Sequence, residues 1–287
     1  MGSGASYHPR LAHKNHKLML SKNEIKEIKA LGQKKFRDER GLFVVEGEKL
    51  VAEALGSGYE VVAHYRVEDI GEDAMARISQ LTHPSPALAV VRQPAPAPFT
   101  LAPDKLVLAL DGVRDPGNLG TILRIADWFG IHHILASEDT VEVYNPKVVQ
   151  ATMGAIFRVR VHYCDLPTLL RCRVESGMTD ERSEAGGNAF DAAFSRGERI
   201  TRATRSESSL PIYGTFLDGE NIYEMPLTKG GIIVMGSEAN GISPEVAATV
   251  TKRLYIPPFP HDAHTSESLN VAVATAITCA EFRRRTV

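Results

Sequence analysis

The sequence predicts an α/β protein in which a small mixed α/β domain precedes a parallel sheet with helices on both faces. From residue 104 onward, short apolar runs alternate with helical patterns, and this alternation is typical of parallel sheets. Before that point, short strands and helices lead to residues 94–98, where alternating prolines favour an extended linker. A chain of 287 residues is long enough for two domains of about 100–200 residues each.

The composition is that of an ordinary globular protein, with 43% hydrophobic and 24% charged residues. No apolar run approaches the roughly 20 residues that span a bilayer, so we expect no membrane segment. Residues 1–20 lack the apolar stretch of a signal peptide and are expected to form a flexible leader. The three cysteines include no C-x-x-C pair, which favours a reducing, cytoplasmic compartment and no zinc site.

The charge of the chain is unevenly distributed. A net charge of −2 does not indicate a nucleic-acid-binding protein, but residues 10–40 contain ten Lys/Arg against four Asp/Glu. Such a segment can neutralise several RNA phosphates, or it can be the solvated face of a helix. Charge alone therefore permits RNA binding without requiring it.

Residues 21–97 are expected to form the small mixed domain. Its first helix covers residues 21–31, because Ile25, Ile28 and Leu31 share one side and Ser21 with Glu24 fits a capping box. The other expected elements are strands at 43–45, 61–63 and 87–91 and a helix at 48–55.

Residues 104–287 are expected to form the parallel sheet and its helices. The expected strands cover residues 106–110, 134–136, 159–161, 212–217, 232–235 and 254–256. The expected helices cover residues 119–129, 146–155, a segment from about 244, and 269–284. Residues 173–209 break the alternation, since they are rich in small, polar and charged residues. We expect them to be a disordered insertion, with a short helix at 190–194 as the alternative.

Ligands of parallel sheets bind beyond the carboxyl ends of the strands, and three segments at such ends carry polar residues. In the first, Asn118 is expected to cap a helix that also carries Arg124; alone, this indicates only a capped helix with a surface arginine. In the second, Gly236, Glu238 and Gly241 follow a strand and suit a tight loop. In the third, Pro257 precedes a polar loop that leads into a helix.

The third segment contains Ser268, Leu269 and Asn270, which supply a hydroxyl and an amide at the start of that helix. Its plainest interpretation is a helix capped by Ser268. His261, Asp262, His264 and Glu267 have the side chains of metal ligands, but no cysteine joins them, and we expect no metal.

In order and spacing, these segments resemble the three signature motifs of the SpoU (TrmH-type) RNA 2′-O-ribose methyltransferases of the SPOUT superfamily. Residues 21–91 also resemble the family's N-terminal substrate-binding domain, especially at residues 41–51. The resemblance implies methyl transfer from S-adenosylmethionine to a ribose 2′-hydroxyl, with ribosomal RNA favoured over transfer RNA. It further implies a trefoil knot in the C-terminal part of the chain and a homodimer formed through the knot region.

The resemblance also implies roles for individual residues. Arg124 is expected to help deprotonate the ribose hydroxyl, while Asn118, Glu238, Ser268 and Asn270 position the reacting groups. The cofactor is expected to lie against Thr215, Phe216, Leu217, Gly236, Gly241, Ile256 and Leu269. The chain departs from the family pattern at Ser237, where Asn is frequent, and at Ala239, where Gly is frequent; both residues are small enough for the cofactor loop to close.

The sequence leaves three questions open. Arg124 is an awkward base because a guanidinium is normally protonated, so it either has an altered proton affinity or holds an RNA phosphate. A catalytically silent RNA-binding factor of ribosome assembly could carry the same fold. A dinucleotide-dependent enzyme is a third possibility, although the glycines lack the spacing that such enzymes require.

Overall fold

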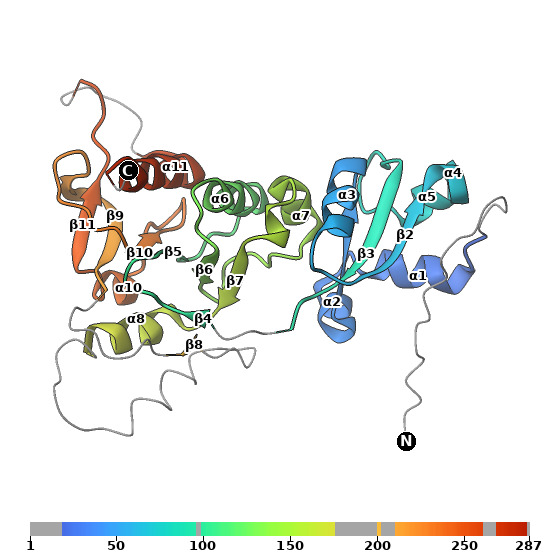
Figure 1. Cartoon of the computed structure of the whole chain (residues 1–287), viewed down its shortest axis with the longest axis horizontal. Helices are drawn as coiled ribbons and strands as arrows, with labels where there is room; N and C mark the ends of the chain where they lie inside the picture. The colour runs from blue at the N-terminus through green and yellow to red at the C-terminus, as the bar shows by residue number, and fades with distance from the viewer. Residues whose placement is uncertain (1–18, 96–98, 176–199, 202–209, 261–267, 286–287) are drawn as a thin grey trace, which may run out of the picture. The chain divides into compact units, whose positions relative to one another are not determined.

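The computed structural model describes residues 19–95, 99–175, 200–201, 210–260 and 268–285. The chain divides into two compact units. The first unit contains Met1–Pro94 and Tyr144–Phe157, and the second contains Ala95–Val143 and Arg158–Val287. Figure 1 labels the helices and strands of both units.

The first unit is built on a three-stranded antiparallel sheet with the order β1-β3-β2. Its elements are α1 (Lys22–Ala30), α2 (Lys34–Arg40), β1 (Leu42–Glu46), α3 (Glu48–Gly56), β2 (Val61–Arg66), α4 (Val67–Ile70), α5 (Glu72–Ile78) and β3 (Ala87–Arg92). The expected capping box at Ser21 and Glu24 is confirmed. The expected apolar side of the first helix is also confirmed, because Ile25, Ile28 and Leu31 are buried in the core of this unit.

Helix α2 was not expected, because its sequence KKFRDER has no apolar stripe. The helix is held instead by a buried cation: the Arg37 guanidinium donates a hydrogen bond of 2.9 Å to the Leu31 carbonyl. Gly41 ends the helix in the left-handed conformation, which glycine adopts without a steric penalty.

Residues 144–157 belong to the first unit although the sequence pattern groups them with the later elements. They contain α7 (Pro146–Thr152) and the 3₁₀ helix η1 (Ala155–Phe157). The ring of Tyr144 lies 4.7 Å from that of Phe43, measured between centroids, and the side-chain amide of Gln150 donates to the Glu46 carbonyl. Contacts of this kind, between residues far apart in the sequence, carry no local signal.

The second unit contains a six-stranded parallel sheet with the order β11-β9-β10-β5-β6-β7. Its elements are β4 (Phe99–Thr100), β5 (Leu106–Leu110), α6 (Pro116–Trp128), β6 (His133–Ala136), β7 (Arg160–Tyr163), α8 (Leu166–Glu175), β8 (Ile200–Thr201), β9 (Ile212–Asn221), β10 (Gly231–Met235), α10 (Pro244–Ala247), β11 (Lys252–Tyr255) and α11 (Val271–Arg284). The predicted α/β class and parallel sheet are thereby confirmed. The short strands β4 and β8 pair with each other outside the main sheet.

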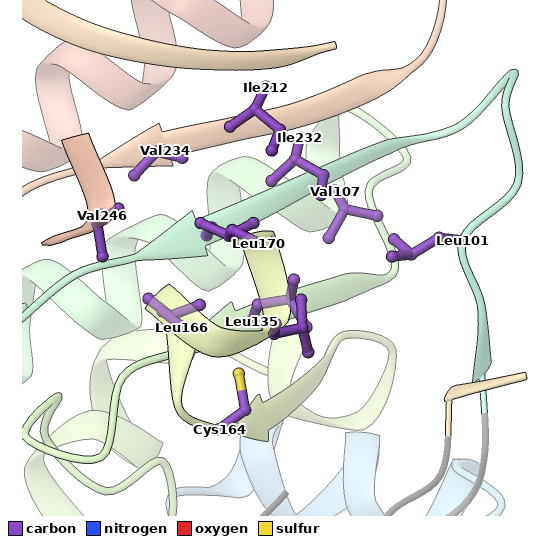
Figure 2. Packing of buried hydrophobic residues seen from close by; sticks show 12 residues of the cluster. Leu101, Val107, Leu135, Cys164, Leu166, Leu170, Ile212, Ile232, Val234 and Val246 are labelled. Carbon is purple, nitrogen blue, oxygen red and sulfur yellow. The ribbon is translucent and has the colours of Figure 1, made fainter. Parts of the chain in front are cut away.

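The central strands of this sheet are buried on both faces, as their uninterrupted apolar sequences predict. Figure 1 shows α6 and α11 on one face and α8 and α10 on the other. On the second face, Val107, Ile232 and Val234 of the sheet pack with Leu166 and Leu170 of α8 (Figure 2). On the opposite face, the ring of Tyr213 meets that of Phe282 of α11 edge-on, 4.9 Å between centroids.

The C-terminal arginines are structural. Arg283 donates to the carbonyl of Phe129 at the end of α6, and Arg285 donates to the carbonyls of Ile222 and Met225. Arg284 and Arg285 both bind the carboxylate of Glu281, whose side chain is only 5% exposed. The hydrogen bond from Arg284, and then that from Arg285, lower the pKa of Glu281. These bonds fix α11, whose first residues contribute to the site described below.

Several expectations fall outside the described residues. The leader at 1–18 and most of the insertion at 173–209, including the alternative helix at 190–194, lie there. Within the insertion the structure describes the end of α8 and the strand β8. Residues 261–267 of the C-terminal part also lie outside the described residues, and the trefoil knot stays a prediction. Among the described helices, none combines the length and apolar character needed to cross a membrane.

Candidate active site

The three polar segments identified in the sequence meet at the carboxyl end of the sheet. The first follows β5 and the second follows β10, its direct neighbour. The third segment follows β11 and leads into α11, which packs beside α6 on the same face of the sheet (Figure 1). The order of the strands therefore brings the first loop next to two loops that lie more than 100 residues later in the chain.

Helix α6 begins earlier than the sequence predicted, at Pro116 instead of Leu119. Asp115, and not Asn118, is its N-cap: the Asp115 carboxylate accepts a hydrogen bond of 2.7 Å from the backbone N–H of Asn118. Proline at the first helical position is compatible with this start because its nitrogen has no hydrogen to leave unpaired. Because Asp115 caps the helix, the Asn118 side chain is available for other contacts.

The side chain of Asn118 joins the three segments. Its amide nitrogen donates a hydrogen bond to the carboxylate of Glu238 in the second segment. Its amide oxygen accepts a hydrogen bond of 3.0 Å from the Asn270 side chain in the third segment. The expectation that these three residues form one site therefore has direct geometric support.

The directions of these hydrogen bonds are fixed by their partners. The side-chain oxygen of Asn270 caps α11, because it accepts from the backbone N–H groups of Ala272 and Val273. The Asn270 nitrogen must therefore donate to Asn118, which leaves the Asn118 nitrogen to donate to the carboxylate of Glu238. This chain of hydrogen bonds fixes the position of the Glu238 side chain relative to Asn118 and Asn270.

The start of α11 also differs from the expectation. The helix begins at Val271 with Asn270 as its N-cap, and not at Leu269 with a cap from Ser268. Ser268 and Leu269 lie before the helix and are exposed. Since Asn270 both caps α11 and binds Asn118, one side chain determines where the helix begins and how it meets the site.

The loop after β10 is closed by two backbone hydrogen bonds of 3.0 Å between Ser237 and Gly241. A Cβ atom on Gly236 would lie 2.2 Å from the carbonyl carbon of Gly241 and 2.3 Å from the nitrogen of Ile242. No side chain fits into that space, so glycine is required at position 236. Gly241 adopts a positive φ of 67°, which lets the loop turn back and present Glu238 at its exposed end.

The residues expected to hold the cofactor lie at the carboxyl ends of three adjacent strands. Thr215, Phe216 and Leu217 are on β9, Gly236 and Gly241 are in the loop after β10, and Ile256 directly follows β11. Only Ile212, Tyr213 and Gly214 of β9 pair with β10. Beyond Gly214 the two strands part, so peptide groups at 215–217 are not used by the β10 ladder. Where two neighbouring parallel strands separate, their backbone N–H and C=O groups can bind a ligand instead of each other.

Strand β9 does not end at Leu217, as the sequence predicted, but continues beside β11 to Asn221. The side chain of Leu217 is 70% exposed to solvent. The ring of Phe216 stacks on the guanidinium of Arg253, 3.5 Å from the ring centroid, and Arg253 also binds Asp218. The Phe216 ring is therefore engaged by Arg253 on one side.

Arg124 lies on α6, six residues after Asn118, and is exposed. Six residues advance a helix by about 9 Å and place the second residue about 120° around the axis from the first. In the described part of the chain, the Arg124 side chain makes no hydrogen bond or ion pair. The structure thus brings Asn118, Glu238 and Asn270 together by hydrogen bonds, whereas Arg124 lies further along α6 and is not joined to them.

A second polar network supports the loop between β5 and α6, and sequence reasoning missed it. The Asp111 carboxylate accepts from the backbone N–H of Ser243 and so ties this loop to the start of α10. The Ser137 hydroxyl accepts from the N–H of Gly112 and donates to Asp139, which binds Arg114. In the sequence, the pair Asp115-Pro116 is typical of a helix start, but no local pattern indicates the contacts of this network.

No group of three or more potential metal ligands occurs among the residues that the structure describes. The acidic and histidine side chains between His261 and Glu267 lie outside them.

Comparison with protein families gives two matches. The model for the SpoU rRNA methylase family matches residues 105–191 and 182–280. The model for the MRM3-like substrate binding domain matches residues 22–76.

Three similar proteins cover nearly the whole chain. The 23S rRNA (guanosine(2553)-2′-O)-methyltransferase RlmP of Bacillus subtilis is 29% identical over 90% of this chain and 95% of its own. The structure of a TrmH-family protein from Porphyromonas gingivalis is 39% identical, covers 93% of this chain and 100% of its own, and superposes with a TM-score of 0.72. An AdoMet-bound rRNA methyltransferase from Sinorhizobium meliloti is 26% identical, with coverages of 94% and 98% and a TM-score of 0.71.

The resemblance stated from the three motifs is therefore confirmed over more than half of the chain by the family match. The match includes Asn118, Glu238 and Asn270, the residues that hydrogen bonds join into one site. This chain belongs to the SpoU rRNA methylase family.

Proposed function

We propose that this chain transfers the methyl group of S-adenosylmethionine to a ribose 2′-hydroxyl of ribosomal RNA. The observation that carries the proposal is the hydrogen-bonded chain Asn270–Asn118–Glu238, which assembles all three family motifs at the ligand-binding edge of a parallel sheet. Similarity to a 23S rRNA 2′-O-methyltransferase over 90% of the chain supports the substrate class.

The residues at the carboxyl ends of β9, β10 and β11 fit a nucleoside cofactor. After Gly214, β9 no longer pairs with β10, so its peptide groups on that side can recognise the edge of an adenine, and Ile256 offers an apolar surface. The backbone of Gly241 and Ile242 packs directly against Gly236, so glycine at this position fixes the shape of the loop that would hold the cofactor. When bound, S-adenosylmethionine supplies an electrophilic methyl group. The related protein from Sinorhizobium meliloti has been crystallised with this cofactor.

The chain's own residues then orient the ribose and stabilise its developing charge. We propose that Glu238, held by Asn118, accepts a hydrogen bond from a ribose hydroxyl, and that Ser268 contributes a second polar contact. An arginine that is exposed to water keeps its charge, so we assign Arg124 to an RNA phosphate beside the target ribose. Its positive charge also stabilises the negative charge that develops on the ribose oxygen as the O–CH3 bond forms, the CH3–S bond of the sulfonium would break and the hydroxyl proton passes to water.

We also propose that two copies of the chain associate through α6 and the start of α11. Trp128 is 86% exposed, and Leu269 and Val273 are each about half exposed, which is unusual for large apolar side chains. Trp128 follows Arg124 by four residues, so both lie on the same exposed face of α6. A partner that covers Trp128 would therefore bring its surface next to Arg124.

Replacing Trp128 with lysine tests the dimer. A charge buried in an apolar interface is strongly unfavourable, so we expect sedimentation analysis to show a dimer for the parent chain and a monomer for Trp128→Lys. Leu217→Lys is the matched control, because it places a lysine at an exposed apolar residue outside the proposed interface. This variant should remain dimeric. A monomeric parent chain, or a dimer that survives Trp128→Lys, would contradict this interface.

The N-terminal unit and the compartment of the protein complete the proposal. The match of residues 22–76 to a substrate-binding domain supports RNA capture by the first unit. Cytoplasmic localisation is supported by Cys164 and Cys279, which are both buried and form no disulfide. Burial raises the pKa of Cys279 to about 12, so this thiol is protonated and unreactive at neutral pH.

A second candidate function, RNA binding without turnover, shares the fold. It is disfavoured because the polar residues of all three motifs are present and three of them are hydrogen-bonded together. Mapping ribose methylation in ribosomal RNA from cells with and without this protein separates the two. We expect one methylated position to be lost when the protein is absent, and an unchanged methylation map would favour the silent factor.

A further inference from the structure

Arg114 is an exposed cation in the loop between β5 and α6. It lies four residues before Asn118 and directly before Asp115, which caps α6. Its side chain is 72% exposed, and its guanidinium forms an ion pair of 2.8 Å with one carboxylate oxygen of Asp139. Arginine has five N–H donors, so a single bond to Asp139 leaves most of them available.

The carboxylate that holds Arg114 is itself fixed in place. The other oxygen of Asp139 accepts a hydrogen bond of 2.7 Å from the Ser137 hydroxyl. Ser137 in turn accepts from the backbone N–H of Gly112, and its hydroxyl lies 3.1 Å from that of Thr140. The Ser137 hydrogen bond, followed by the interaction with Arg114, lowers the pKa of Asp139. Arg114 therefore differs from an ordinary surface arginine, because a network anchored on two strand ends orients it.

This network lies against the active-site loop. A Cβ atom placed on Gly112 would be 3.3 Å from the Asp139 carboxylate and 3.6 Å from the Cβ of Ser237. Asp139 and Ser237 are thus neighbours across Gly112, and Ser237 directly precedes Glu238. Arg114 is in consequence presented beside the site that Asn118, Glu238 and Asn270 form.

We propose that Arg114 binds a phosphate of the substrate RNA next to the methylated nucleotide, and that Asp139 and Ser137 are positioning residues that orient its guanidinium. The inference rests on the proposed function for the identity of the ligand. A planar guanidinium with several available donors matches the geometry of a phosphate, whereas a purely structural brace would not need an exposed charge.

The test is Arg114→Gln, which removes the charge and keeps a polar side chain. Binding of an unmodified 23S rRNA transcript is measured over a range of KCl concentrations, and each lost phosphate contact lowers the salt slope by about 0.7–0.9. We expect that reduction, a rise of about tenfold in the KM for RNA, and a kcat within about twofold of the parent. Affinity for S-adenosylhomocysteine and the melting temperature should not change.

Arg158→Gln is the matched control. Arg158 pairs with Asp127 near the other end of α6, so the variant removes the same charge from a similar ion pair away from the site. It should keep the parent's salt slope. An unchanged slope in Arg114→Gln, or equal reductions in both variants, would overturn the proposal. A fall in cofactor affinity or melting temperature would assign Arg114 to loop structure instead and would overturn it as well.

Asp139→Asn separates positioning from simple charge neutralisation. If Asp139 orients Arg114, the KM for RNA rises in Asp139→Asn, and the same change has no further effect in the Arg114→Gln background. A lower KM in Asp139→Asn would contradict a positioning role. If the parent chain transfers no methyl group to this RNA, the proposed function fails, while the salt slopes still report whether Arg114 contacts phosphate.

Discussion

Replacing Arg124 with alanine is expected to lower kcat for methyl transfer by about 10²–10³-fold, because it removes the charge that stabilises the developing oxyanion. Affinity for S-adenosylhomocysteine and the melting temperature should stay at the parent values. The reason is that Arg124 is exposed and has no hydrogen bond or ion pair among the described residues. Methyl transfer to unmodified ribosomal RNA measures the rate, titration with S-adenosylhomocysteine measures the affinity, and thermal unfolding measures the melting temperature.

Arg124→Lys is the matched variant. Lysine keeps the positive charge and loses the planar fork, so a residue that binds phosphate should recover part of the lost rate. If Arg124→Ala retains turnover within tenfold of the parent with unchanged cofactor binding, the assignment of Arg124 to the reaction is wrong.

Replacing Gly236 with alanine is expected to weaken cofactor binding by at least about 100-fold. The new Cβ would lie 2.2 Å and 2.3 Å from backbone atoms of Gly241 and Ile242, so the loop must open to accept it. Backbone atoms that are hydrogen-bonded on both sides of the loop cannot shift cheaply. Calorimetric titration with S-adenosylhomocysteine measures the loss, and circular dichroism with thermal melting checks that the variant remains folded.

Gly241→Ala is the control within the same loop. Its Cβ would meet no atom within 4 Å, and only the positive φ of 67° opposes the change, at about 1–2 kcal/mol. We therefore expect a loss of affinity of about 30-fold or less. Equal affinities for Gly236→Ala and the parent would show that this turn does not shape the cofactor site.

The sequence predicted the parallel sheet well because its strands are buried on both faces and are apolar throughout. Val107, Ile232 and their neighbours needed no knowledge of their partners to be recognised as core. The three motifs were also found, because each combines glycine or proline with one or two polar residues at a strand end. Their residue types showed where chemistry was possible, and family resemblance supplied the reaction.

What the sequence could not predict depends on contacts between distant segments. Asp115 and Asn118 are equally good helix caps by residue type, and only the bonds to Glu238 and Asn270 show why Asn118 is not used as one. Helix α2 was missed because a buried arginine holds it instead of an apolar face. The Ser137–Asp139–Arg114 network joins residues 25 positions apart that carry no shared motif.

The central claim is that the assembled motifs methylate a ribose hydroxyl of ribosomal RNA. The most direct measurement incubates the chain with labelled S-adenosylmethionine and unmodified 23S rRNA, digests the RNA to nucleosides and identifies the labelled product by mass spectrometry. The account predicts a single labelled 2′-O-methylnucleoside, whose 3′ phosphodiester resists alkaline hydrolysis in the undigested RNA. It also predicts that Arg124→Ala incorporates label at least about 100-fold more slowly under the same conditions. Label in a base-methylated nucleoside, or no incorporation by a chain that binds both S-adenosylhomocysteine and the RNA, would contradict it.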